Sequence, residues 1–288
     1  MHLFMPTIPL FNSRIPALLL AASMAFNACT SDEGEILDTQ TAVVQGYLYA
    51  GQPVDSLRIT QSYAYIRQDS TLLTLDDLQI QISDGTNTYP LLSTGEGYYM
   101  QPDLVIASGK NYTLQFNWNN QTVSAQTYVP EQREAEISAA EVYMTKITSG
   151  SGFNPGNLEN TDPVEITWEN PEGEYYYVVI KNLEESPEYI NDFLAEREQN
   201  FPGGFRRFIF IGRPQISSRY TIDPRRELTQ FGRYAVIVYR VNPEYAALYA
   251  VSGSSSQSIT QPPTNVDNGL GIFTGVSSDT VYFEVKKK

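Results

Sequence analysis

Short strand-like segments separated by turn residues constrain this fold most. Residues 78–82 alternate strictly between apolar and polar side chains, as a half-buried β-strand does. Asp84, Gly97 and Gly109 supply turn chemistry, and such signals recur at a spacing of roughly ten residues up to residue 127. This spacing is too short for a strand–helix–strand repeat. It therefore predicts an antiparallel β-sandwich over residues 39–129.

The second half of the chain, residues 130–288, also predicts sheet, with two short helices added. Apolar, β-branched runs indicate the strands, which we expect at 164–168, 175–180, 208–211, 234–239 and 280–285. A capping side chain precedes proline at Ser186 and again at Asn242. Apolar residues then recur at helical spacing, which predicts helices near 187–199 and 243–252. The expected fold is mainly β: two sandwich-like domains, the second with two helices.

The N-terminus has the order of a secretory signal. Residues 1–28 contain Arg14 and no acidic residue, and an apolar run at 15–26 ends just before Cys29. This run is too short to span a bilayer. Because Ala28 precedes the lone cysteine, we predict a lipoprotein signal peptide and acylation of Cys29, with residues 29–38 as a flexible acidic tether. The alternative is an ordinary cleaved signal followed by an incidental free thiol.

Composition excludes several kinds of chemistry. The sole histidine, His2, lies within the predicted signal, so the mature chain has no histidine for a catalytic triad or a zinc site. A formal net charge of −14 repels phosphate backbones, which argues against nucleic-acid binding. We therefore expect a non-enzymatic protein without cofactor or metal. The remaining catalytic alternative is a hydrolase that uses paired carboxylates.

Arginine side chains form a basic island in this acidic chain. Eight of them lie between residues 201 and 240, where guanidinium groups could hold a carboxylate or a phosphate. The candidates for contact with an anion or a partner are Arg206, Arg207, Arg213, Arg225 and Arg226. The alternative is that these arginines face outward on strands and pair with acids of neighbouring elements.

Twenty tyrosines suggest a second kind of contact. Exposed tyrosine rings can stack on a ligand, and the candidates for such a platform are Tyr63, Tyr65, Tyr98 and Tyr99. Tyrosine is equally common in sandwich strands, where the ring packs and the hydroxyl reaches water. Core packing therefore remains the alternative.

Three groups of residues resemble a known family. They are the runs 43–48 and 57–62, the pair of turns at 97–99 and 109–114, and the segment 262–273 after the predicted helix. Together they resemble outer-membrane lipoproteins of Bacteroidota grouped as domain of unknown function 4249. The resemblance implies an immunoglobulin-like or transthyretin-like N-terminal module, a second β-rich module and pairing with a TonB-dependent receptor.

The predicted location follows from the lipid and the tether. The acidic run at residues 31–33 is similar to the signal that sends lipoproteins of this phylum to the cell surface. We expect a lipid-anchored outer-membrane protein, facing the exterior, that serves as an accessory or ligand-capture subunit of a TonB-dependent transporter. The alternative is a structural or adhesive surface protein that binds glycans or host polymers. The residues do not identify a ligand.

Overall fold

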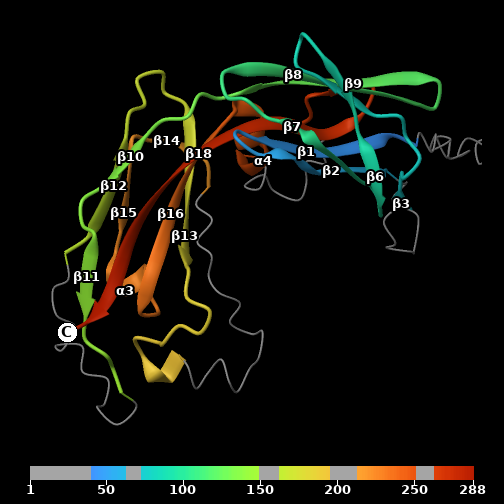
Figure 1. Ribbon diagram of the computed structural model, residues 1–288. Helices are drawn as coiled ribbons and strands as arrows, with labels where there is room; N and C mark the ends of the chain where they lie inside the picture. Colours follow the sequence, from blue (N-terminus) through green and yellow to red (C-terminus); the bar gives the residue numbers. More distant parts are fainter. Residues whose placement is uncertain (1–39, 63–72, 149–161, 195–212, 251–262) are drawn as a thin grey trace, which may run out of the picture. The chain divides into compact units, whose positions relative to one another are not determined.

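The computed structural model describes residues 40–62, 73–148, 162–194, 213–250 and 263–288 (Figure 1). Cys29, the tether and the strand expected at 208–211 lie outside these ranges. In the described part the chain is mainly β, which confirms the predicted fold class. The strands of the first half are β1 (Ala42–Tyr49), β2 (Pro53–Gln61), β3 (Leu73–Thr74), β4 (Gln81–Ser83), β5 (Thr88–Pro90), β6 (Leu92–Gly95), β7 (Tyr98–Val105), β8 (Lys110–Trp118) and β9 (Gln121–Val129).

The second half contains further strands and two labelled helices. The strands are β10 (Ala135–Ile137), β11 (Glu141–Met144), β12 (Val164–Trp168), β13 (Tyr175–Asn182), β14 (Gln215–Ile216), β15 (Arg219–Ile222), β16 (Gly232–Val241), β17 (Val266–Asp267) and β18 (Leu270–Lys287). The helices are α3 (Pro224–Glu227) and α4 (Pro243–Ala250).

One large sheet is shared by two sandwiches. Its strand order is β14-β13-β16-β18-β1-β2-β7-β6, with β11 paired to β18 and β3 paired to β2. A five-stranded sheet, β17-β9-β8-β4-β5, forms the opposite layer of the first sandwich, and β10-β12-β15 forms that of the second. The long strand β18 runs parallel to β1 in its first part and antiparallel to β16 further on (Figure 1). A strand near the C-terminus therefore belongs to both sandwiches.

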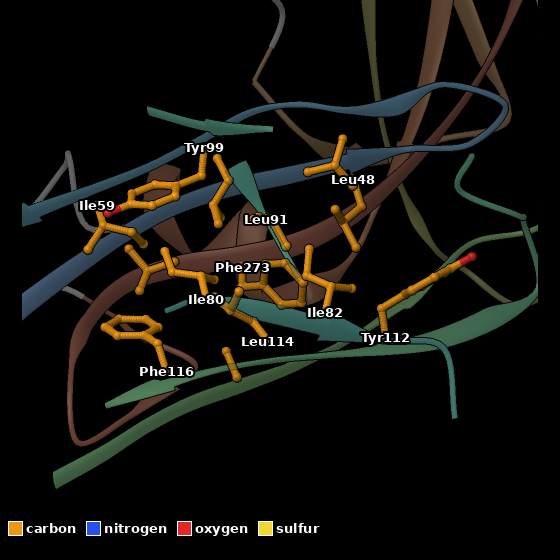
Figure 2. Packing of buried hydrophobic residues seen from close by; sticks show 14 of the residues in the cluster. Leu48, Ile59, Ile80, Ile82, Leu91, Tyr99, Tyr112, Leu114, Phe116 and Phe273 are labelled. Atoms are coloured by element: carbon orange, nitrogen blue, oxygen red, sulfur yellow. The ribbon is translucent and has the colours of Figure 1, made fainter. Parts of the chain in front are cut away.

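The first core forms because alternate side chains of facing strands point inward. Along β8 the buried residues are Tyr112, Leu114 and Phe116, which meet Phe273 of β18 in the middle of the cluster (Figure 2). Burying a side chain of this size stabilises the fold by about 1.5–3 kcal/mol. Phe273 is fully buried although it lies far from β8 in the sequence. The last part of the chain thus completes the first core.

The second core lies between the three-stranded sheet and the other part of the large sheet. Alternate residues of β12 point inward, and Trp168 packs its ring on Tyr176 of β13 at a centroid distance of 5.2 Å. The buried residues of this cluster are Val142, Val164, Ile166, Trp168, Tyr176, Val178, Ile190, Ile222, Leu228, Phe231, Tyr234, Val236, Val238, Phe283 and Val285.

The observed helices match the helices predicted from the capping residues and prolines only in part. Helix α4 lies where the sequence predicts it, but the chain at 187–191 is not helical, and helical structure begins at residue 192. The physical reason is β pairing: the Ile190 amide donates to the Thr229 carbonyl at 2.9 Å, and the Phe231 amide donates to the Glu188 carbonyl at 2.8 Å. Residues 195–199 of the expected helix lie outside the described ranges.

Helix α3 has the same start signal but was not predicted. Pro224 occupies its first turn, and the Asp223 carboxylate accepts a hydrogen bond from the Arg225 amide at 3.1 Å. A single turn has no room for apolar periodicity, so the cap is its only sequence signal.

Candidate functional site

Six tyrosines that are distant in sequence gather beside helix α4, and we call them the tyrosine cluster. They are Tyr47 and Tyr49 of β1, Tyr177 of β13, Tyr239 of β16, and Tyr245 and Tyr249 of α4. Tyr177 and Tyr239 are direct partners in the β13–β16 register, so their rings share one face of the sheet. All six side chains are partly exposed.

The rings of the tyrosine cluster contact one another in the arrangements that aromatic pairs prefer. Tyr177 lies between Tyr239 and Tyr245, with centroids 4.8 and 5.8 Å away and interplanar angles of 15° and 24°. Tyr47 meets Tyr245 edge-on, at 6.0 Å and 82°. The hydroxyls of Tyr245 and Tyr249 lie 3.0 Å apart, within hydrogen-bond distance. Five of the six rings are thus held by neighbouring rings, so this part of the surface is preorganised.

The start of α4 is fixed to both β9 and β18. The side-chain amide of Asn242 donates to the carbonyls of Tyr128 at 2.7 Å and Gly275 at 3.3 Å. One Glu244 oxygen accepts from the Thr274 hydroxyl at 3.1 Å and from the Thr127 hydroxyl at 3.4 Å. Tyr245 and Tyr249 are four residues apart, so they share one side of α4. Because the start of α4 is anchored in this way, both side chains lie over the large sheet.

Burial controls the protonation of the cluster. Loss of water raises the pKa of the Tyr177 phenol, and the charge of a nearby Tyr49 phenolate would raise it further. Burial also raises the pKa of Tyr245, and a hydrogen bond with Tyr249 acts in the same direction. The pKa values of Tyr47, Tyr49 and Tyr239 are raised mainly by burial. These five phenols therefore keep their protons well into the alkaline range and offer hydroxyl groups.

The predicted stacking platform is wrong for Tyr99. Its side chain is fully buried, and its hydroxyl donates to the Leu75 carbonyl at 2.6 Å and accepts from the Leu78 amide at 3.1 Å (Figure 2). Neighbouring residues of a strand point to opposite faces, so Tyr98 and Tyr99 cannot present their rings together. Tyr98 is 37% exposed, with the Arg58 guanidinium 4.7 Å from its ring centroid. Tyr63 and Tyr65 lie outside the described residues.

The predicted arginine contacts are separated by the fold. Arg225 and Arg226 lie on α3, while Arg213 lies just before β14, and all three are exposed. Arg226 pairs at 3.8 Å with Asp223, the cap of its own helix, whereas the alternative interpretation expects arginines on strands that pair with acids of neighbouring elements. Arg206 and Arg207 lie outside the described ranges, so the anion site stays a prediction.

A half-open pocket lies beside β10 and β12, with a volume of about 620 Å³. Its lining combines carboxylates, one guanidinium and one indole; the residues are Gln132, Arg133, Glu134, Glu136, Thr167, Trp168 and Glu169. Among the described residues, no group of three or more histidine, cysteine or acidic side chains is arranged to hold a metal ion. The helices in this described part are also too short or too polar to cross a membrane.

Sequence reasoning missed the tyrosine cluster because its members meet only through the register of the large sheet. Two local signals were present. Tyr47 and Tyr49 are two residues apart on a strand, and Tyr245 and Tyr249 are four apart on a helix, so each pair shares a face. The pairing of Tyr177 with Tyr239 depends on two strands that are far apart in the chain.

Comparisons with known proteins support a family but not an activity. No curated protein matches the chain significantly. The solved structures that it matches include the crystal structure of domains A168-A170 from titin, with 12% identity, a TM-score of 0.20, and coverage of 86% of this chain and 67% of that one. The model of the domain of unknown function DUF4249 matches residues 28–281. Since this match spans most of the sequence, the chain belongs to the DUF4249 family.

Proposed function

We propose that this protein is a lipid-anchored accessory subunit that captures a ligand for a TonB-dependent outer-membrane transporter. The observation that carries the capture role is the tyrosine cluster: six partly exposed aromatic rings with hydroxyl groups, five of them held by neighbouring rings. Tyrosine is enriched in contact surfaces because it offers a large area with only two side-chain torsions to fix. In this proposal the protein is not an enzyme and uses no cofactor.

The location in the proposal rests on the N-terminal sequence. Cys29 directly follows an apolar run, and an acidic tether separates it from the first strand, Ala42–Tyr49. Acylation would anchor the chain in the outer membrane, and the acidic residues after the cysteine support a position on the outside. One acyl chain alone gives reversible membrane binding, so a barrel partner or a second acyl chain would make the attachment stable.

A second candidate function uses the same surface. A structural or adhesive protein could bind glycans or host polymers through the tyrosine cluster, without any transporter. Partially exposed aromatic rings favour this role as well as ligand capture. The presence or absence of a receptor partner separates the two functions.

Co-purification tests the accessory role. We expect affinity-tagged protein from detergent-solubilised outer membranes to bring a β-barrel receptor with it. Purification of Cys29→Ser, which lacks the lipid, would report whether the receptor is held by protein contacts. If no barrel accompanies the wild-type protein, the accessory role is wrong and the adhesive candidate takes its place.

A further inference from the structure

The tyrosine cluster offers two kinds of contact to a ligand. The ring faces that the stack of Tyr239, Tyr177 and Tyr245 leaves uncovered attract apolar C–H groups, because the π-system carries partial negative charge on its faces. The hydroxyl groups both donate and accept hydrogen bonds. The Tyr245 and Tyr249 hydroxyls already lie within hydrogen-bond distance, at 3.0 Å, so they can present a shared polar edge. A ligand that uses both kinds of contact would present apolar C–H faces and hydroxyl groups in alternation along its length.

Charge narrows the ligand class further. Phenols are uncharged at neutral pH, so the cluster itself has no charge to match an ionic ligand. One oxygen of the nearby Glu244 carboxylate accepts from the hydroxyls of Thr127 and Thr274, and a carboxylate beside the cluster disfavours an anionic ligand. The net charge of −14 also repels polyanions such as sulfated polymers and nucleic acids. The surface therefore fits a neutral ligand.

The width of the cluster indicates a chain of rings. Its strand tyrosines come from β13, β16 and β1, and β18 lies between β16 and β1 in the sheet. Neighbouring strands are about 4.8 Å apart, so these four strands span roughly 14 Å. Several aromatic rings along this distance could each contact a different unit of an oligomer.

We propose that the tyrosine cluster binds a neutral oligosaccharide. The C–H faces of the sugar rings stack on the partly exposed phenols, and the sugar hydroxyls exchange hydrogen bonds with the tyrosine hydroxyls. This inference rests on the proposed capture role and names the ligand class for that role. A protein segment that docks on the same rings is the competing outcome in the test below.

Binding by the purified full-length protein provides the test. The probes are neutral hexasaccharides of glucose, mannose and galactose, together with a sulfated hexasaccharide, each titrated by calorimetry. We expect at least one neutral probe to bind and the sulfated one not to bind. Tyr239→Ala removes one ring of the stack and should weaken binding about tenfold, equivalent to about 1.4 kcal/mol. Tyr239→Phe keeps the ring and should weaken binding less.

Matched controls come from exposed tyrosines elsewhere on the protein. Tyr143 and Tyr282 are 46% and 47% exposed and do not belong to the cluster, so Tyr143→Ala and Tyr282→Ala should bind as the wild type does. Near-ultraviolet circular dichroism would show whether Tyr239→Ala keeps its fold. If that variant unfolds, Tyr49→Ala replaces it, because Tyr49 is outside the stack formed by Tyr177, Tyr239 and Tyr245.

Several outcomes would contradict the inference. Absence of binding to every neutral probe overturns it, as do tighter binding of the sulfated probe and an equal loss in the control variants. A receptor that co-purifies with the wild type, but not with Tyr239→Ala, while no sugar binds would identify the cluster as a protein-docking surface. In that case the accessory role stands and the oligosaccharide inference falls. If a neutral sugar binds but no receptor co-purifies with the wild type, the oligosaccharide inference stands and the accessory role falls.

Discussion

At the scale of single residues, Arg240 shows how the fold handles a buried charge. It lies on β16, is 6% exposed, pairs with Glu174, and donates from Nη1 to the Glu131 carbonyl at 2.8 Å. Glu131 follows β9, so the Arg240 guanidinium links the segment that leaves the first sandwich to strand β16 of the large sheet. Removing one partner of a buried pair leaves the other charge uncompensated, which is strongly destabilising.

We predict that Arg240→Leu lowers the free energy of unfolding by about 2–3 kcal/mol. The loss falls below the usual range for a fully buried pair, because the Glu174 side chain is 31% exposed and water screens part of its charge. Urea denaturation would measure the change. Arg226→Leu is the control, since its side chain is 84% exposed, and it should change the stability by less than about 0.5 kcal/mol. Equal effects would refute this account of Arg240.

The lipid attachment is also a prediction about one residue. Cys29→Ser removes the thiol that acylation requires, and we expect the protein to leave the membrane fraction and appear in the soluble fraction. Mass spectrometry of the wild-type N-terminal peptide would show the acyl chains directly. Membrane association that persists unchanged in Cys29→Ser would contradict anchoring through this lipid.

At the scale of elements, the pairing of β1 with β18 depends on close backbone contact. Gly271 has a φ of +96°, a conformation that other L-residues rarely adopt, and an added Cβ would collide with the Val44 backbone. Its partner in the register is Val44 itself. The parallel pairing of β1 with β18 therefore depends on this glycine.

We predict that Gly271→Ala destabilises the protein by about 2–4 kcal/mol, because it adds a backbone collision to the cost of positive φ. The matched control is Gly85→Ala: Gly85 has a φ of +85°, and an added Cβ would meet no atom within 4 Å. Gly85→Ala should lower the free energy of unfolding by about 1–2 kcal/mol. Thermal unfolding of both variants would test the difference, and a Gly85 variant as unstable as the Gly271 variant would refute it.

Helix α4 provides a second prediction at this scale. Asn242→Ala removes the amide that holds its first turn to β9 and β18, which should cost about 1–3 kcal/mol and weaken the near-ultraviolet dichroism of the clustered tyrosines. Asn111→Ala, on the exposed side of β8, is the control and should leave both quantities unchanged. If the dichroism survives in Asn242→Ala, the anchor is not what fixes the cluster.

The sequence predicts most elements but not their partners. Apolar, β-branched runs locate strands such as β12 and β16, because side-chain type reflects local burial. The strictly alternating residues 78–82 are strand only from Gln81 onward, in β4. The same patterns carry no information on pairing, so they miss that Phe273 enters the first core and that Tyr177 meets Tyr239. Tyr99 shows the same limit: its neighbour Tyr98 has the same side chain, and only the pleat decides which one is buried.

At the scale of the whole molecule, the tyrosines link stability to alkaline pH. Burial raises the pKa of Tyr177, Tyr234 and Tyr245 above the ordinary value of 10.0. A raised folded-state pKa means that the stabilisation is fully present below the unfolded pKa and is lost as pH rises through the folded one. The protein should therefore lose stability progressively above about pH 10.

Urea denaturation at increasing pH would measure this loss, with phenolate absorbance as a second readout. The double variant Tyr177→Phe/Tyr245→Phe lacks two of the half-buried phenols with raised pKa, so its stability should fall less steeply above about pH 10. The exposed pair Tyr128→Phe/Tyr282→Phe is the control. A double variant that falls as steeply as the wild type would show that the clustered tyrosines are not responsible.

The shared strand β18 has a consequence for biogenesis. If the protein is secreted as proposed, its chain emerges from the N-terminal side, and β1 appears long before Phe273 and the β18 residues that pair with β1. The first sandwich then remains open, with β1 exposing an unpaired edge, until β18 has emerged. An open strand edge is a site for wrong pairing, so on this proposal periplasmic chaperones that protect such edges should associate with the protein before β18 emerges.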